Sequence, residues 1–542
     1  MPTITFSPDD LQKLVGQKLD EKKMTYLMDC AKAEIDAKLT NEITVKFNDT
    51  NQPYLWSPEG LARLFKNILG KQKGIPAIKV QKSQDKVIYD KRLTKIRPHI
   101  ACFKATGKKI DEYLLKQLIQ LQEKLAENFG RKRQKISIGV YPLKNITFPV
   151  NCKAASPDEK FTPLDFHQPA SLRQTLEKHP KGKEYGHLIK NESVYPVFVD
   201  AKKSIMSLIP IINSEQTGRL KVGDDSLFFD TTGTDEESVD LVANIFAYAL
   251  AERGFTIQSL TIEYSGKKVV TPSLENKKIK FNEKEIAKVL GIELKTNEVK
   301  TLLNKMGYDY QTGTVTIPSY RNDIMHQVDI IEDIGIAYGY DNFQPLPLTS
   351  YTRGATFPSQ QLADTQRNLW IGLGYQEIMS AVLSNKELLY DKMSVQDFGT
   401  IQIENHISQT YSCVRTWILP ILLDLLSKNK HIDYPQRVFE QGPVTIQEKE
   451  PRDEQHLAAV STHSTATFTE LRQAVETTLR NSNIAYSIEE YELDCFIPGR
   501  AAKIIINKKM AGFIGEFHPA ILEKFGLHTP TAGCEINLGA LK

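Results

Sequence analysis

The sequence TVTIPSYRNDIMHQVDIIEDIGIAYGYDNFQPLPL, from Thr314 to Leu348, decides how the chain is interpreted, because spacing, charge and turn signals agree there. A short β-branched run ends at Pro318, and a turn leads into a helical pattern that lasts to about Gly339. Asn322 or Asp323 is the predicted N-cap of this helix. The stretch therefore predicts a strand, a turn and an amphipathic helix.

The predicted helix carries an acidic face, on which Asp329, Glu332 and Asp333 lie at i, i+3 and i+4. Asp323 lies near the helix start and can point toward them. These like charges repel, and no lysine or arginine occupies a neighbouring helical position. A divalent cation with oxygen ligands, Mg²⁺ before Ca²⁺, would fit such a cluster. A solvated acidic face is the alternative, and spacing alone favours it, because such faces are common.

The same stretch also resembles a known domain. The resemblance rests on the runs Ile317-Pro318-Ser319-Tyr320-Arg321-Asn322-Asp323-Ile324, Asp329, Glu332-Asp333-Ile334 and Ala337-Tyr338-Gly339-Tyr340-Asp341-Asn342. These runs are similar to the tRNA-binding, metal-binding domain of the β subunits of phenylalanine–tRNA ligases of the archaeal and eukaryotic type. In that family the matching positions hold Mg²⁺ at the contact with the α subunit. The resemblance therefore implies four metal ligands, Asp323, Asp329, Glu332 and Asp333.

Composition is that of an ordinary soluble protein: 542 residues, 41% hydrophobic, with a net charge of +3. No apolar run is long enough to span a bilayer and no signal pattern begins the chain, so we expect no membrane contact and a cytoplasmic location. The six cysteines form no C-x-x-C pair, which argues against a zinc site. Because the net charge is small, any nucleic-acid contact needs local basic patches, for which residues 131–135 and 179–183 are candidates. Each could equally be a solubilising surface run.

Four regions are predicted along the chain, and together they indicate a multidomain α+β protein. They are an N-terminal α/β region over 1–95, an α+β region over 96–271, a winged-helix-like region over 272–348 and a larger α/β region over 349–542. In the first region we expect helices over 7–15 and 27–39, a strand over 43–47 and a helix that begins at Ser57-Pro58.

Polar residues interrupt two otherwise apolar segments of the second region, 204–214 and 227–235. The latter, LFFDTTGTD, reads as a strand ending in a polar turn, which could hold a ligand or merely cap the following helix. Both segments resemble the editing domain of the same β subunits, which hydrolyses tRNA wrongly charged with tyrosine. The resemblance implies that Asp230, Thr232 and Ser207 line the editing site, where they position substrate and orient water. Ile209 departs from the proline usual in the family before Pro210.

The last region is similar to a class II synthetase domain built on an antiparallel sheet. The similarity is carried by Gly374-Tyr375-Gln376-Glu377, Val414-Arg415-Thr416, Phe496-Ile497-Pro498-Gly499-Arg500 and Ile514-Gly515-Glu516-Phe517-His518-Pro519. The alternating glycines and the arginine–acid pair of an ATP site are missing, and no phosphate-binding loop motif occurs elsewhere. We therefore expect this region to lack catalytic motifs and to build an interface.

The resemblance extends over essentially the whole chain and implies a β subunit of an α₂β₂ phenylalanine–tRNA ligase. In such an enzyme the α subunit binds ATP and phenylalanine and charges tRNA(Phe), while the β subunit supplies the interface, tRNA contacts, Mg²⁺ and editing. The alternative is a stand-alone RNA-binding or regulatory protein derived from that subunit.

Overall fold

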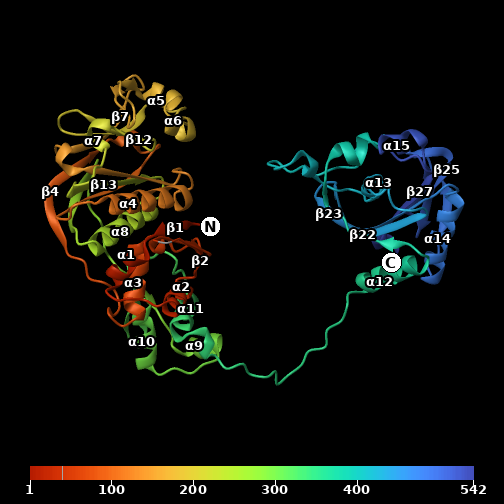
Figure 1. Cartoon of the computed structure of the whole chain (residues 1–542), viewed down its shortest axis with the longest axis horizontal. Helices are drawn as coiled ribbons and strands as arrows, with labels where there is room; N and C mark the ends of the chain where they lie inside the picture. Colours follow the sequence, from red (N-terminus) through yellow and green to blue (C-terminus); the bar gives the residue numbers. More distant parts are fainter. Residues whose placement is uncertain (40, 542) are drawn as a thin grey trace. The chain divides into compact units, whose positions relative to one another are not determined.

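The computed structural model describes residues 1–39 and 41–541 of the chain. The chain divides into two compact units, Met1–Leu346 and Pro347–Lys542, each with its own hydrophobic core (Figure 1). The prediction of a multidomain protein of mixed α and β structure is confirmed.

The first unit begins with a three-stranded antiparallel sheet in the order β1-β3-β2. Its elements and their helices are β1 (Thr3–Phe6), α1 (Pro8–Val15), α2 (Glu21–Cys30), β2 (Ala33–Lys38), β3 (Ile43–Phe47) and α3 (Pro58–Ile68). The predicted cap of α3 is confirmed, because the Ser57 hydroxyl accepts a hydrogen bond from the Gly60 N–H at 3.1 Å. The helix predicted over 27–39 is wrong in its second half. Lys32 adopts a left-handed φ of 51° after α2, and residues 33–38 pair with β3 instead.

A ten-stranded sheet forms the centre of the first unit, as far as the described residues show, in the order β12-β11-β10-β7-β4-β14-β5-β13-β6 with β15 beside β14. The strands are β4 (Val80–Tyr89), β5 (His99–Thr106), β6 (Ile136–Pro142), β7 (Val150–Ala155), β10 (Tyr195–Val199), β11 (Ile205–Leu208), β12 (Ile212–Asn213), β13 (Ser226–Gly233), β14 (Thr256–Tyr264) and β15 (Lys267–Thr271). The sequence analysis assigned residues 80–89 to the N-terminal region, whereas β4 pairs with β14 and β7 in the large sheet.

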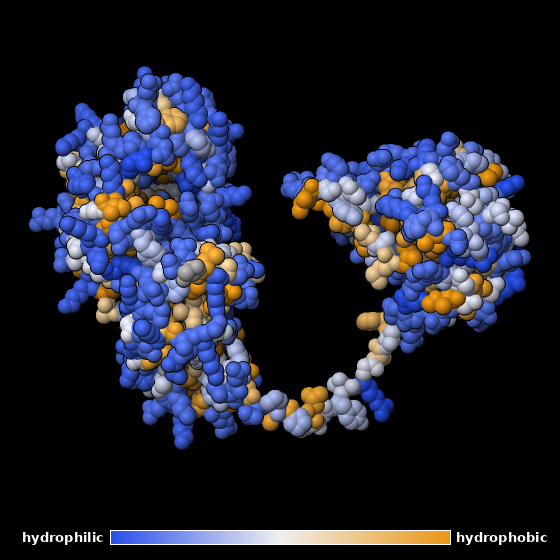
Figure 2. Space-filling view, in the orientation of Figure 1, coloured by the Kyte–Doolittle hydropathy of each residue, from blue (hydrophilic) through white to orange (hydrophobic). Residues whose placement is uncertain are grey.

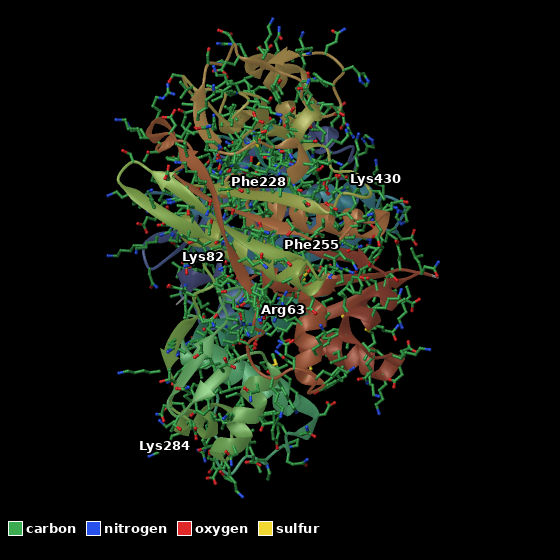
Figure 3. All side chains as sticks on the ribbon, turned by 90° about the vertical axis from the view of Figure 1, so that its left-hand side faces the viewer. Arg63, Lys82, Phe228, Phe255, Lys284 and Lys430 are labelled. Atoms are coloured by element: carbon green, nitrogen blue, oxygen red, sulfur yellow. The ribbon has the colours of Figure 1, made fainter. Side chains whose placement is uncertain are left out.

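Two long helices, α4 (Glu112–Lys124) and α8 (Glu236–Glu252), pack against one face of this sheet through a shared apolar core (Figure 1). Near the end of α8, the guanidinium of the buried Arg63 from α3 lies 5.3 Å from the ring centre of Tyr248 and 4.6 Å from that of Tyr320. Arg63 thereby joins α3, α8 and the segment before the acidic helix (Figure 3).

The first unit ends in a small region of three strands and three helices with sheet order β16-β18-β17. Its elements are β16 (Lys277–Lys280), α9 (Lys284–Leu290), α10 (Thr296–Lys305), β17 (Asp309–Gln311), β18 (Thr314–Ile317) and α11 (Gln327–Tyr338). The predicted N-cap of α11 is wrong: the helix begins after His326, whose Nδ1 accepts from the Val328 N–H at 3.3 Å.

The second unit is built on a seven-stranded sheet in the order β19-β22-β23-β27-β26-β25-β24, as described. All neighbours are antiparallel except β19 and β22. The strands are β19 (Gln376–Glu377), β22 (Gln436–Gln447), β23 (Pro451–Thr462), β24 (Ser487–Glu490), β25 (Phe496–Ile506), β26 (Lys509–Phe517) and β27 (Thr531–Asn537), and the helices are α12 (Pro358–Gly372), α13 (Leu419–Lys428), α14 (Phe468–Asn481) and α15 (Pro519–Lys524). Between residues 376 and 403 the described chain forms only two short strands, β19 and β20 (Leu383–Ser384). No helix in the described ranges is both long and apolar enough to cross a membrane.

Candidate active site

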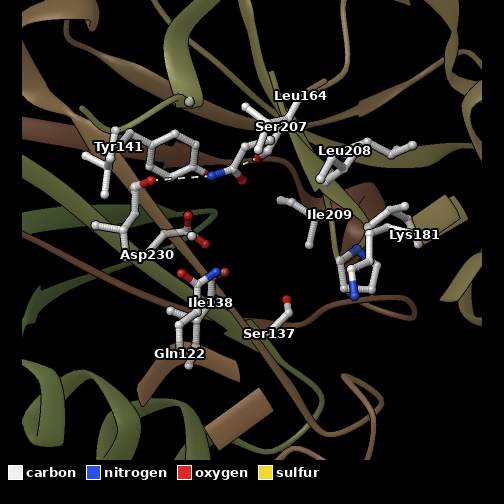
Figure 4. Close-up of a pocket in the computed structure, with 18 of the residues that line it drawn as sticks. Gln122, Ser137, Ile138, Tyr141, Leu164, Lys181, Ser207, Leu208, Ile209 and Asp230 are labelled. Atoms are coloured by element: carbon white, nitrogen blue, oxygen red, sulfur yellow. Dashed lines mark hydrogen bonds between the residues drawn. The ribbon is translucent and has the colours of Figure 1, made fainter. Parts of the chain in front are cut away.

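A cavity of about 390 Å³ opens along the edge strand β6 of the ten-stranded sheet (Figure 4). Its walls come from β6, the C-terminal part of α4 and the segment that follows β11. Side chains cover the free edge of β6, because Gln122 donates to the Ile138 carbonyl at 2.9 Å and Asn213 donates to the Val140 carbonyl at 3.4 Å. The cavity is therefore placed where a sheet edge would otherwise meet solvent.

Asp230 and Ser207, two of the three predicted editing residues, face this cavity from β13 and β11 (Figure 4). Asp230 is 3% exposed, and its Oδ2 has no hydrogen-bond partner among the described residues. Burial raises the pKa of Asp230 to about 7, against the opposing effect of the neighbouring Tyr141 hydroxyl. The Tyr141 hydroxyl donates a hydrogen bond to Ser207 Oγ at 3.0 Å. The cavity thus holds a carboxyl group with one unpartnered oxygen atom and a pKa raised to about 7.

Thr232, the third predicted residue, does not line the cavity. Its side chain is fully buried and its hydroxyl lies 2.8 Å from the hydroxyl of Ser137, which does line it. Thr232 and Asp230 lie two positions apart on β13 and so share a face. Thr232 therefore supports the cavity wall through Ser137.

Gly139 on β6 leaves the space that the Asp230 carboxyl group occupies. A Cβ added to Gly139 would lie 2.1 Å from Asp230 Oδ2 and 2.4 Å from the Tyr141 hydroxyl. No side chain larger than hydrogen fits there without displacing these groups.

The cavity offers carboxyl, hydroxyl, amide and cationic side chains. Its lining, within the residues described, includes no histidine or cysteine, so a serine–histidine triad cannot form. A carboxyl group with a pKa near 7 can accept a proton or a hydrogen bond at neutral pH. The Ser207 and Tyr141 hydroxyls can orient a water molecule or a substrate.

The predicted magnesium ligands lie around α11, and two of them are held by a buried arginine. Arg321 Nη1 lies 2.8 Å from Asp333 Oδ2, and its Nε donates to Asp323 Oδ1 at 3.0 Å. The Tyr308 hydroxyl also donates to Asp333, at 2.5 Å. Burial acts to raise the pKa of Asp323, but Arg321 outweighs it and lowers that pKa. Arg321 supplies the positive charge that the sequence analysis assigned to a metal ion.

The other two predicted ligands point elsewhere. Asp329 Oδ2 accepts hydrogen bonds from the N–H groups of Met325 and His326 at 2.8 Å each, at the start of α11. Glu332 forms an ion pair with Lys32 at 2.7 Å, and half of its side chain is exposed. No three histidine, cysteine, aspartate or glutamate side chains in the described part of the chain gather as a metal site. These carboxylates, as arranged, do not fit a shared divalent cation.

Comparisons with known proteins agree with the resemblance in the sequence. The family model of the tRNA synthetase B5 domain matches residues 279–340, and that of the phenylalanyl tRNA synthetase beta chain CLM domain matches residues 344–538. The phenylalanine–tRNA ligase beta subunit of Pyrococcus horikoshii is 40% identical, with 100% of both chains covered. This chain belongs to the family of phenylalanine–tRNA ligase β subunits.

Two further comparisons within this β-subunit family also show similarity in sequence and in structure. The beta subunit of Archaeoglobus fulgidus is 35% identical, over 100% of this chain and 98% of its own. A crystal structure of an N-terminal fragment of the Pyrococcus horikoshii β subunit is similar at a TM-score of 0.61 and 41% identity, and covers 62% of this chain and 100% of the fragment.

Sequence reasoning about this family member missed the contribution of β6. Ser137, Gly139 and Tyr141 occupy alternate positions of that strand and line the cavity. A polar or absent side chain at every second position of an otherwise apolar strand is the signal that could have identified them. Gln122 also lines the cavity, but no local pattern distinguishes it from surface residues. Arg133, which lines the cavity too, lies in the basic run 131–135 that was a candidate for nucleic-acid contact.

Proposed function

We propose that this chain is the β subunit of an α₂β₂ phenylalanine–tRNA ligase and that its cavity at β6 hydrolyses tRNA(Phe) wrongly charged with tyrosine. The observation that carries the editing proposal is the buried Asp230 carboxyl group, whose Oδ2 lacks a hydrogen-bond partner within the described structure. An unsatisfied acceptor in a cavity of this size is costly unless a ligand supplies a donor.

Tyrosine supplies that donor and phenylalanine does not. A pocket shaped for phenylalanine rejects one added hydroxyl only weakly, so the charging site alone discriminates poorly. A second site that requires the hydroxyl discriminates strongly, because its polar group stays unpaired with the wrong substrate. In our proposal Asp230 accepts a hydrogen bond from the tyrosine phenol, while Ser207 and Tyr141 orient the attacking water. Thr232 holds the wall in place through Ser137.

The second unit has the interface role in this proposal, and the α subunit performs the chemistry with ATP and phenylalanine. In the second unit of this chain, Arg415 forms an ion pair with Glu440 at 2.6 Å, and both side chains are buried. That guanidinium is therefore occupied within the protein. Apolar side chains gather on the surface of this unit (Figure 2), and the large exposed ones include Met379 and Tyr411. These surfaces favour burial against another chain.

Three finer assignments belong to the same proposal. We keep the division into an N-terminal region, an editing domain, a winged-helix-like domain that contacts tRNA and a class II synthetase-like domain. We place the protein in the cytoplasm, since all six cysteines are free and buried. We assign Mg²⁺ no shared site among Asp323, Asp329, Glu332 and Asp333, because Arg321 already forms ion pairs with Asp323 and Asp333.

Deacylation of Tyr-tRNA(Phe) by the complex with the α subunit tests the editing proposal. We expect Asp230→Ala to abolish hydrolysis while phenylalanine charging persists. Asp240→Asn is the matched control, because burial also raises the pKa of Asp240, to about 6, yet it does not line the cavity. A chain that neither pairs with an α subunit nor deacylates Tyr-tRNA(Phe) would instead be the stand-alone RNA-binding protein.

A further inference from the structure

Three consecutive basic residues near the cavity adopt the left-handed backbone conformation. Arg131, Lys132 and Arg133 have φ values of 49°, 51° and 63° and follow the π-helical turn Leu125–Phe129 at the end of α4. Residues with a Cβ avoid this conformation, and a run of them is rarer still. Such a turn persists only where its surroundings enforce it, which marks it for a function other than solubility.

Two arginines fasten this turn to the protein. The buried Arg97 donates from Nη1 to the Gln134 carbonyl at 3.0 Å and from Nη2 to the Arg133 carbonyl. Arg133 in turn donates from Nη1 to the Ile211 carbonyl at 2.7 Å, on the segment that forms one wall of the cavity. The turn is therefore fixed in position relative to the cavity.

The result is a basic rim, which we define as Arg131, Lys132, Arg133 and Lys181. Arg133 and Lys181 line the cavity, and Lys181 lies across it from Asp230 in Figure 4. Arg131 and Lys132 are exposed, and neither forms an ion pair with any described residue. Arg131 and Lys132 directly precede Arg133, which lines the cavity, and consecutive Cα atoms are about 3.8 Å apart, so the backbone of both residues lies close to the cavity wall.

Carboxylates neutralise the rim only in part. Glu184 lies 3.1 Å from Lys181 Nζ, and Glu127 lies 3.9 Å from Arg133 Nε. The Tyr185 hydroxyl lies within hydrogen-bond distance of both carboxylates, 2.5 Å from Glu127 Oε1 and 2.7 Å from Glu184 Oε1. Two of the four cations therefore remain available to an anionic ligand.

We infer that the basic rim binds the backbone phosphates of an RNA strand whose aminoacylated 3′ end enters the cavity. The inference rests on the proposed editing function and names the part of the substrate that the rim recognises. Phosphate is the anion expected here, because guanidinium and ammonium groups on a rigid turn match its charge and geometry. The contact carries no base specificity, so it positions the strand and leaves discrimination to the cavity.

The test uses the double variant Arg131→Gly/Lys132→Gly in the full complex. Glycine adopts positive φ without strain, so the turn is retained while both charges are removed. Two substrates are compared: Tyr-tRNA(Phe), and tyrosine esterified to adenosine, which carries no phosphate. The control is Lys22→Ala/Lys23→Ala, an exposed adjacent basic pair on α2.

We expect the KM for Tyr-tRNA(Phe) to rise about tenfold at low salt with kcat unchanged. The slope of log KM against log salt concentration should fall by roughly 1 for each phosphate contact that is lost, and we expect one to two such contacts. The KM for the adenosine ester should stay constant, and the control should match the wild type. An unchanged KM for Tyr-tRNA(Phe), or an equal rise in KM with both substrates, would show that the basic rim does not bind phosphates. The editing proposal would still stand in that case. If the wild type hydrolyses neither substrate, the editing function itself is wrong and the rim's role falls with it.

Discussion

Replacing Asp230 with asparagine should stabilise the protein at pH 8 while it abolishes deacylation. Burial raises the pKa of this carboxyl group from its ordinary 3.8 to about 7. At about 1.4 kcal/mol for each pH unit, keeping it ionised above pH 7 costs the folded state roughly 4 kcal/mol. Asparagine has nearly the same shape without the charge, and its amide still needs partners, so we expect a gain of roughly 2–4 kcal/mol.

The pH dependence gives this prediction a definite sign. Because the folded-state pKa of Asp230 lies above its unfolded value, the group stabilises the folded state below about pH 4, and this contribution is lost as pH rises through about 7. The difference in the free energy of unfolding between the variant and the wild type should therefore fall by about 2.5 kcal/mol between pH 8 and pH 5.

Urea unfolding followed by tryptophan fluorescence measures these values. The chain has 3 tryptophans, and Trp56 is the one in the first unit, where it is 1% exposed in the same apolar core as Phe229 of β13. Replacing Trp370 and Trp417 by phenylalanine leaves Trp56 as the reporter of that unit. Titrations at pH 5 and pH 8 are compared in this background with and without Asp230→Asn.

Two outcomes would contradict the reasoning. If Asp230→Asn lowers the free energy of unfolding at pH 8, the carboxylate is a structural hydrogen-bonding group and its burial serves the fold. If the difference from the wild type is the same at both pH values, Asp230 does not titrate near neutral pH, and the argument for an unpartnered acceptor in the cavity fails.

Three further predictions concern the buried charges and the cavity. Arg321→Met should lower the free energy of unfolding of the first unit by about 3–5 kcal/mol, because Asp323 and Asp333 lose their buried counterion; a loss below about 1 kcal/mol in the same urea titration would argue against this role. Dialysis against EDTA or addition of Mg²⁺ should leave the melting temperature of the isolated chain unchanged, and a Mg²⁺-dependent rise would show that a metal ion displaces the ion pairs. Gly139→Ala should reduce kcat for deacylation by about 100-fold, because its Cβ would meet Asp230 Oδ2 at 2.1 Å; near-normal rates would mean that Asp230 can move away without loss.

Local patterns predicted much of the fold, and their failures share a cause. The start of α3 at Pro58 followed from a serine–proline cap signal, and the helix expected over 7–15 forms as α1. The segment 33–38 was wrongly predicted as helix. Its strand conformation depends on pairing with β3, which a local sequence pattern does not reveal. The start of α11 was predicted too early, because Asp323 is held by Arg321 and by Gln52 and so cannot cap the helix.

The sequence by itself determined the family of this protein and, through the family resemblance, two of the residues in its cavity, Asp230 and Ser207. Only the tertiary structure decided the charge state and partners of these groups. It placed Arg321 and Lys32 against the acidic helix, although Lys32 lies 300 residues from Glu332. It also enclosed Asp230 between β6 and β11, which raises the pKa of its carboxyl group. The physical reason is range: caps and periodicity act within a few residues, whereas burial and ion pairing depend on segments that meet only when the chain has folded.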